Sequence, residues 1–256
     1  MMSKFWIYGD SFARDWGIDW QWHRQLAGFA NRDLVVKGDF GVSNDWILMQ
    51  LAEDWFADQF KKDDVIILIT TSCNRYWFLK DHPTISNYNQ MTMFHNYKDK
   101  WGVTDEQQQA IELYFKHIHQ GYLDAFRFDA HIAWINDMSN KLAQKGVKLM
   151  LLPGWDNFSH VVPQASLPVK GSLVASASEL EFTSADAMDK WYSRPIPDQR
   201  VNHLIKDNHY ELAKAIANTI TTNTVLDLNS IKWKHGVLNV QTEKMFSNQL
   251  SPTLIR

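Results

Sequence analysis

The sequence has very little cysteine and no long apolar run. Its 256 residues include one cysteine, Cys73, so an internal disulfide is excluded and a reducing compartment is favoured. No window approaches the roughly 18 consecutive apolar residues of a membrane-spanning helix. The chain passes from Met1–Lys4 directly into an apolar stretch, which leaves no room for a signal peptide. We therefore expect a cytoplasmic protein, and a phage-encoded protein would look the same.

An excess of positive charge is also missing. The chain carries 26 Lys and Arg against 29 Asp and Glu, a net charge of −3, with both signs mixed along its length. This balance argues against nucleic acid and anionic membranes as main partners. A glycine-rich phosphate loop is absent, which disfavours a flavodoxin-like binder of nucleotide or phosphate. We find no repeat, low-complexity run or linker, and the length fits one domain of unknown oligomeric state.

Aromatic side chains, in contrast, are abundant. The chain has 12 Trp, 14 Phe and 8 Tyr. Most should lie in the core, but so many rings also suggest an aromatic-lined groove. Trp16 and Trp20 follow the first apolar stretch closely and stand beside Asp and Arg. One or two of these rings could stack on a sugar; the alternative is that they only cover the edge of a sheet.

Strand-like and helix-like segments alternate over the first 150 residues. This alternation is typical of a parallel sheet covered by helices, so we predict an α/β protein with three α/β/α layers. After the first strand, which ends near Gly9, the expected strands are 34–36, 64–69, 147–152 and 225–228. The expected helices are 22–29, 47–60, 104–119, 122–142 and 208–220.

Two segments lack periodicity, and we predict them to be insertions at the rim of the sheet: 79–103 and 156–202. Capping boxes are expected at Thr104 with Gln107 and at Asn208 with Glu211, each opening a helix. We expect residues 1–222 to form the functional domain. Residues 223–256 should form a C-terminal tail packed on that same domain.

Ser11 is the most informative candidate for chemistry. The apolar run that begins at Trp6 stops on Gly9-Asp10-Ser11, and glycine allows a sharp turn at the end of a strand. Because ligands of open α/β sheets bind at the carboxyl ends of strands, this hydroxyl would lie where chemistry occurs.

A nucleophilic serine also needs a base, a group that orients the base, and donors for the oxyanion. Asn44 follows the second strand, Asn74 follows the third, and His203 precedes the last helix.

In this order and spacing, Gly9-Asp10-Ser11-Phe12, Asn74 and His203 resemble the sequence blocks of the SGNH, or GDSL-type, hydrolases. The resemblance covers roughly residues 4–220. It implies a flavodoxin-like central parallel sheet and no metal or organic cofactor. It also implies that Ser11 is the nucleophile, His203 the base and Asn74 the side-chain oxyanion donor, together with the backbone N–H of Ser11.

The chain departs from that pattern beside the base. The family Asp usually stands three residues before the His, where this chain has Arg200. Asp198 is the nearest upstream carboxylate and the preferred partner of His203. Asp207, or a backbone carbonyl, could orient the ring instead.

Two further departures concern the oxyanion donors. The block-two glycine position is occupied by Asn44, whose backbone N–H could serve equally, and Gly41 is the alternative. Arg75 follows Asn74 where the family often has Asp, and Ser72 stands in place of the usual Gly.

Other reactive side chains give weaker signals. We expect Cys73 to be a small buried residue rather than a nucleophile. His117 and His119 would face different sides of a helix, and His95 and His131 lack companions at ligand spacing, so no metal site is expected. His209 lies close to His203, but its place inside a capping box favours a structural role.

Together these features predict a serine ester hydrolase of the acetylesterase type. The preferred substrate is an O-acetylated carbohydrate or another small ester, with Asp10, Trp16, Trp20 and Arg75 as candidate substrate contacts. Lipid esters are less favoured, because no amphipathic lid helix is evident. The alternative is a non-catalytic carbohydrate-binding protein that retains the fold, a reading that Arg200 favours.

Overall fold

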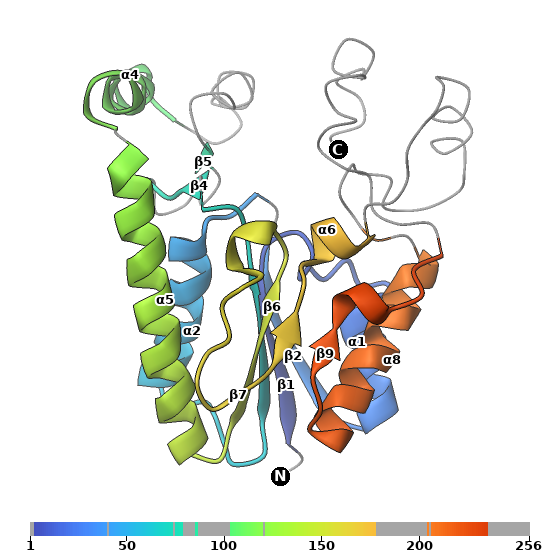
Figure 1. Ribbon diagram of the computed structural model, residues 1–256. Helices are drawn as coiled ribbons and strands as arrows, with labels where there is room; N and C mark the ends of the chain where they lie inside the picture. The colour runs from blue at the N-terminus through green and yellow to red at the C-terminus, as the bar shows by residue number, and fades with distance from the viewer. Residues whose placement is uncertain are drawn as a thin grey trace, which may run out of the picture.

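The central element is a parallel sheet. The computed structural model describes residues 3–39, 41–73, 75–78, 85–86, 103–119, 121–177, 204 and 206–234. Five parallel strands pair in the order β2-β1-β3-β6-β7 (Figure 1). They are β1 (Lys4–Gly9), β2 (Asp33–Gly38), β3 (Val65–Thr70), β6 (Lys148–Pro153) and β7 (Ser166–Leu167). The order reverses between β1 and β3, and such a switch point is where doubly wound sheets bind ligands.

Helices cover both faces of the sheet, which confirms the predicted three-layer α/β/α architecture. On one face lie α1 (Trp22–Ala30) and α8 (Lys206–Thr222), which pack against each other. On the other face lie α2 (Asn44–Phe56) and α5 (Gly121–Gln144). Figure 1 shows the two pairs on opposite sides of the strands.

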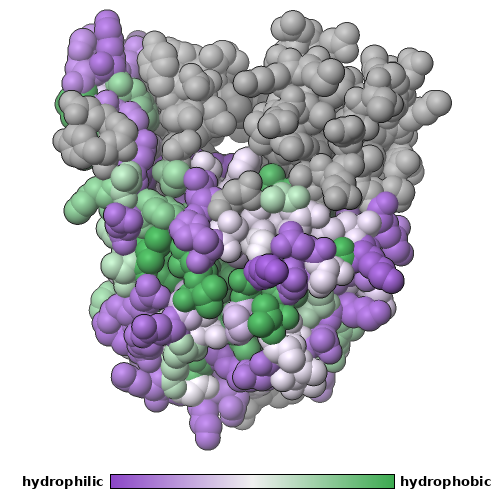
Figure 2. Space-filling model, viewed as in Figure 1, coloured by the Kyte–Doolittle hydropathy of each residue, from purple (hydrophilic) through white to green (hydrophobic). Residues whose placement is uncertain are grey.

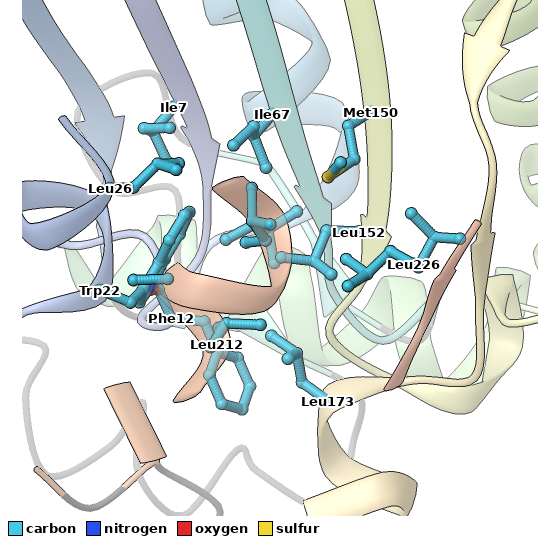
Figure 3. Packing of buried hydrophobic residues seen from close by; sticks show 14 of the residues in the cluster. Ile7, Phe12, Trp22, Leu26, Ile67, Met150, Leu152, Leu173, Leu212 and Leu226 are labelled. Atoms are coloured by element: carbon cyan, nitrogen blue, oxygen red, sulfur yellow. The ribbon is translucent and has the colours of Figure 1, made fainter. Parts of the chain in front are cut away.

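The strands alternate their side chains between two cores. Phe5 and Ile7 of β1 face the core that α1 and α8 cover, while Trp6 and Tyr8 face the core under α2 and α5. Every residue of β3 is buried, as expected for a central strand covered on both faces. Figure 3 shows the first core, with Ile7, Ile67 and other labelled side chains packed between the sheet and α8.

A third, smaller cluster lies beyond the end of β3. The predicted capping box at Thr104 and Gln107 is confirmed and opens α4 (Asp105–Leu113). This helix continues as a π-helix, η2 (Tyr114–Ile118). A short antiparallel pair, β4 (Arg75–Tyr76) with β5 (Ile85–Ser86), follows β3. The rings of Tyr76, Phe78, Tyr114 and Phe115 pack together between these elements.

The prediction that 156–202 is irregular was wrong for its first part. After η3 (Asp156–Phe158), this stretch contains β7, β8 (Val169–Lys170) and α6 (Leu173–Ala177). Two-residue strands are too short to produce a readable alternation of side chains, so periodicity did not reveal them. Residues 178–203 lie outside the described residues, as does nearly all of the predicted 79–103 insertion.

The predicted strand near residue 226 is present but short. β9 (Leu226–Asp227) pairs in parallel with β8 and leads into the 3₁₀ helix η4 (Leu228–Ser230). Leu226 and Leu228 are buried in the first core. These residues therefore complete the core of the sandwich, and 235–256 lie outside the described residues.

The second predicted capping box was wrong. Helix α8 begins at Lys206, so Asn208 lies inside its first turn. Asn208 is fully buried and its Oδ1 accepts a hydrogen bond from the Lys234 backbone N–H at 2.9 Å. Asparagine in a first turn can bind any nearby backbone group, and here the tertiary partner replaces the local one.

The surface is mixed in polarity. On the face shown in Figure 2, hydrophilic residues occupy the flanks and hydrophobic residues gather toward the middle. Of the helices described, none combines the length and apolar character that crossing a membrane requires.

Candidate functional site

The turn that carries Ser11 directly follows β1. The Asp10 carbonyl accepts hydrogen bonds from the N–H groups of Ala13 at 2.9 Å and Arg14 at 3.2 Å, which closes one helical turn. Ser11 is the first residue of that turn and is 9% exposed. The turn therefore holds Ser11 at the carboxyl end of β1, beside the switch point.

Gly9 is needed at this place for a different reason than expected. Its φ angle is not positive, so the turn does not demand glycine for its backbone conformation. Instead, a Cβ on Gly9 would lie 2.7 Å from the Cβ of Ile69 in β3. Close packing of β1 against β3, rather than the turn, excludes a side chain here.

The Asp10 carboxylate is the internal anchor of this turn. One oxygen accepts the Phe12 N–H at 3.1 Å; the other accepts the Thr71 hydroxyl at 2.9 Å and the Arg75 guanidinium at 3.1 Å. Asp10 is fully buried, and the Arg75 side chain is 15% exposed. Burial lowers the pKa of Arg75, and the Asp10 carboxylate opposes that shift. The structure thus gives both residues a structural role, and their predicted contact with substrate stays a prediction.

Phe12 fixes the other side of the turn. Its ring lies in the first core, near Leu212 and Leu173 (Figure 3). The buried Trp22 indole N–H donates to the Phe12 carbonyl at 2.8 Å. The residues on both sides of Ser11 are therefore held by buried contacts.

Asn44 ties the start of α2 to the residue that follows β3. Ser43 caps α2 by accepting from the Trp46 N–H at 3.3 Å, which makes Asn44 the first helical residue. The Asn44 amide donates to the Thr71 carbonyl at 3.0 Å and accepts from the Thr71 N–H at 2.9 Å. Its backbone N–H, in the first helical turn, has no intrahelical acceptor. Gly41, the alternative donor, adopts a positive φ of 70°.

Sequence reasoning missed Thr71. Its hydroxyl binds Asp10 and its backbone binds Asn44, so it joins the predicted positions that follow β1 and β2. The available signal was a pair of hydroxyl residues, Thr70 and Thr71, directly after the apolar run Val65–Ile69.

The tryptophans after Ser11 are largely occupied by protein contacts. The Arg14 guanidinium lies 4.5 Å from the Trp16 ring centre, and Trp16 is 39% exposed. Trp20 packs against the His209 ring with centroids 5.1 Å apart. Trp16 is thus the better placed of the two predicted rings to meet a ligand.

His209 has the structural role that we expected, although through a different contact. Its Nδ1 accepts the backbone N–H of Trp22, the first residue of α1, at 3.2 Å. Gln21, at the N-cap of α1, makes no side-chain cap hydrogen bond. His209 therefore caps α1 from α8.

Four residues of the predicted site, or beside it, lie outside the described residues: Asn74, Asp198, Arg200 and His203. Their assigned roles stay predictions. Leu204, which follows His203, is buried in the same core as Phe12, which follows Ser11. Asp207, the alternative partner of His203, is exposed in the first turn of α8, where an acidic residue favours the helix by itself.

A hollow lies beside this edge, between the residues that follow β3 and β6 and the start of α5. Its volume is about 440 Å³, and its lining residues are Cys73, Asp124, Ala125, Phe128, Asn157 and His160. This volume falls in the range of roughly 300–1,000 Å³ typical of small-molecule sites. Within the described ranges, no three His, Cys, Asp or Glu side chains are grouped so that they could hold a metal ion.

Fold and site together define the class. This is a doubly wound α/β/α protein with a buried polar network at the switch point between β1 and β3 and a serine at the edge of that network.

No protein-family model and no curated protein matches the sequence. Among solved structures, the chain is similar to a protein described as lipolytic and of the G-D-S-L family from Desulfitobacterium hafniense. The two are 12% identical with a TM-score of 0.41, over 84% of this chain and 98% of that one.

Two acetyl xylan esterases are also similar in structure. The first is 11% identical with a TM-score of 0.34, over 96% of this chain and 100% of that chain. The second is a catalytic mutant of an enzyme from Geobacillus stearothermophilus. It is 13% identical with a TM-score of 0.33, over 97% of this chain and 93% of that chain.

Proposed function

We propose that this protein is a serine hydrolase of small carboxylic esters, with an O-acetylated carbohydrate as the preferred substrate. The single observation that carries the proposal is the position of Ser11. It follows β1 at the switch point of the sheet, in a turn whose neighbouring residues are held by the buried Asp10 and Phe12. A hydroxyl held in this way meets a substrate without having to be ordered at each turnover.

In the proposed mechanism, the Ser11 Oγ attacks the ester carbonyl carbon while His203 takes the hydroxyl proton. The negative charge that develops on the carbonyl oxygen is stabilised by the Asn74 amide and by backbone N–H groups of Ser11 and Asn44. The alcohol leaves with the proton from His203. Water, deprotonated by His203, then releases the acid from Ser11.

Two structural features support the assignment of these groups. Asn44 and Thr71 join the loops after β2 and β3 by two hydrogen bonds, so the two predicted oxyanion loops share one rigid connection. Leu204 and Phe12, which follow the proposed base and nucleophile, lie in one buried core. Asp198 remains the proposed partner of His203.

The hollow beside the site supports a neutral, hydroxyl-rich alcohol group. Phe128 offers a ring to the apolar face of a sugar, while Asn157 and His160 offer hydrogen-bonding groups. Asp124 also lines the hollow; its carboxylate accepts from the Tyr76 hydroxyl and contacts His119, and its negative charge would disfavour an anionic ligand. This combination suits a sugar better than a lipid chain or a phosphate.

The test combines labelling with kinetics. A fluorophosphonate should modify Ser11, as mapped by mass spectrometry. The change Ser11→Ala should lower kcat for p-nitrophenyl acetate by several orders of magnitude, on the order of 10⁶ where a catalytic triad acts as a unit. The matched control is Ser230→Ala, an exposed serine on η4, which should leave both labelling and kcat unchanged.

Two results would reject this assignment. Labelling at another residue, or unchanged turnover in the Ser11→Ala protein, would remove Ser11 from the mechanism. Saturable binding of an acetylated sugar with no label and no hydrolysis would instead identify a carbohydrate-binding protein that retains the fold.

A further inference from the structure

Arg127, on α5, holds the segment that follows β3 by two backbone carbonyls. Its guanidinium donates to the carbonyl of Cys73 at 3.5 Å and to the carbonyl of Arg75 at 3.1 Å. The residue between these two carbonyls in the sequence is Asn74. In Figure 1, this segment, marked by β4, lies beside the upper ends of α2 and α5.

The guanidinium is itself held by partners on other elements. It donates to the Asp45 carboxylate of α2, and its carbon atom lies 3.8 Å from the centre of the Tyr76 ring. His131, one turn further along α5, contacts the other Asp45 oxygen at 2.8 Å. Burial opposes ionisation of Asp45, but the His131 hydrogen bond and the Arg127 and His131 charges hold its pKa below the ordinary value. Arg127 thus joins α2, α5 and the segment after β3.

The same segment reaches the turn of Ser11. The Arg75 carbonyl accepts from Arg127, while the Arg75 guanidinium donates to Asp10, whose other oxygen accepts the N–H of Phe12. A continuous series of described hydrogen bonds therefore connects Arg127 to the residues on both sides of Ser11.

We propose that Arg127 is a positioning residue for the esterase reaction: it fixes Cys73 and Arg75, and through Arg75 and Asp10 the turn that carries Ser11. This inference rests on the proposed function. The role requires arginine, because a planar guanidinium can donate in several fixed directions at once, here to two carbonyls and a carboxylate. Lysine would keep the charge but not this geometry.

The experiment compares Arg127→Met and Arg127→Lys with wild-type protein, using p-nitrophenyl acetate and an acetylated monosaccharide. We expect kcat to fall about 10- to 100-fold in both variants, since misplacement of a catalytic group by about 1 Å can cost 10²-fold, with KM changed less than about threefold. The matched control is Lys141→Met. It removes a cation of an exposed ion pair with Asp137 on the same helix and should leave kcat unchanged.

A double-variant cycle separates positioning from stability. If Arg127 acts through Arg75, then Arg127→Met should lower kcat less than about threefold in an Arg75→Met background, where the link to Asp10 is already broken. An undiminished loss in that background would overturn the proposal. So would unchanged kcat in either Arg127 variant below its melting temperature, or full activity with lysine. If the methionine variant does not fold, the lysine variant carries the same comparison.

Failure of the underlying function gives a different result. Wild-type protein that neither turns over esters nor reacts with a fluorophosphonate would overturn both proposals together. An active wild-type enzyme whose Arg127 variants match Lys141→Met would overturn the positioning role alone.

Discussion

Gly9 shows how a single residue at the edge of the sheet is determined by packing. The sequence suggested a glycine needed for a sharp turn. The φ angle of Gly9 is not positive, however, so other residue types could adopt the same backbone conformation. What excludes a side chain is the neighbouring strand, because the Cβ of Ile69 leaves no space. Gly38, at the end of β2, is similar: a Cβ there would lie 2.6 Å from the Cβ of Ala13. Small residues thus allow the turn of Ser11 to lie directly on the strand ends.

We therefore expect Gly9→Ala to lower the free energy of unfolding by about 1–3 kcal/mol through overpacking. The control is Gly28→Ala, because a Cβ at Gly28 in α1 would meet nothing within 4 Å. That change should raise stability by up to about 1 kcal/mol. Urea unfolding at pH 7 measures both changes. Equal effects in the two variants would show that the contact between Gly9 and Ile69 can relax.

At the scale of elements, the contact between α1 and α8 gives His209 a structural role. His209 accepts the Trp22 N–H and packs on Trp20, so its ring is part of the contact between the two helices. His203 precedes α8 and is the proposed base. The two side chains should therefore respond differently to the same substitution.

We expect His203→Ala to lower kcat by at least about 10³-fold with little change in melting temperature, because it removes the base. His209→Ala should retain kcat at low temperature but lower the free energy of unfolding by about 1–3 kcal/mol, since the buried Trp22 N–H loses its acceptor. Ester hydrolysis and thermal melting of the two variants give the comparison. Loss of kcat in the His209 variant alone would reverse the assignment of the base.

The elements themselves were largely readable from the sequence. Four strands of the sheet and the four long helices were predicted near their observed positions, because continuous apolar runs and helical spacing are local signals. β7 was not predicted, since Ser166–Leu167 is too short to show a period. The capping box at Asn208 failed because its partner, the Lys234 N–H, is distant in sequence.

The candidate site was less predictable than the elements. Ser11 and Asn44 were predicted as candidates because each comes after a strand in the sequence, and their roles stay predictions. Arg127, Asp45 and His131 were missed because they come from two helices, and Asp45 lies 82 residues before Arg127 and 86 before His131 in the sequence. Local pattern places residues at a strand end; it does not show which distant side chain will hold them.

At the scale of the whole molecule, a buried histidine couples folding to pH. His23 in α1 is fully buried, and burial lowers its pKa to about 4 from 6.5, with the Asp15 charge opposing the shift. The folded state therefore favours the neutral ring, while the unfolded chain binds a proton near pH 6.5. The contribution of the neutral His23 ring to the free energy of unfolding is complete above pH 6.5 and is lost as the pH falls toward 4.

Lowering the pH from 7 to 4.5 should reduce the free energy of unfolding by about 2 kcal/mol, because His23 binds a proton in the unfolded chain but not in the folded protein. In His23→Leu that part of the pH dependence should disappear. His160→Leu, which changes an exposed histidine, should keep it. Urea unfolding at the two pH values measures the difference. Parallel curves for wild type and His23→Leu would show that another group controls acid stability.

Cys73 gives this molecule a practical property. It is the only thiol in the chain, it is partly exposed, and it borders the hollow proposed to receive the sugar. A thiol-directed fluorophore or spin label would therefore attach at one defined position without any engineered cysteine. Burial raises the pKa of the thiol, so labelling calls for mildly alkaline solution. The native sequence thus supplies its own spectroscopic reporter, placed where it would register the binding of a ligand in the hollow.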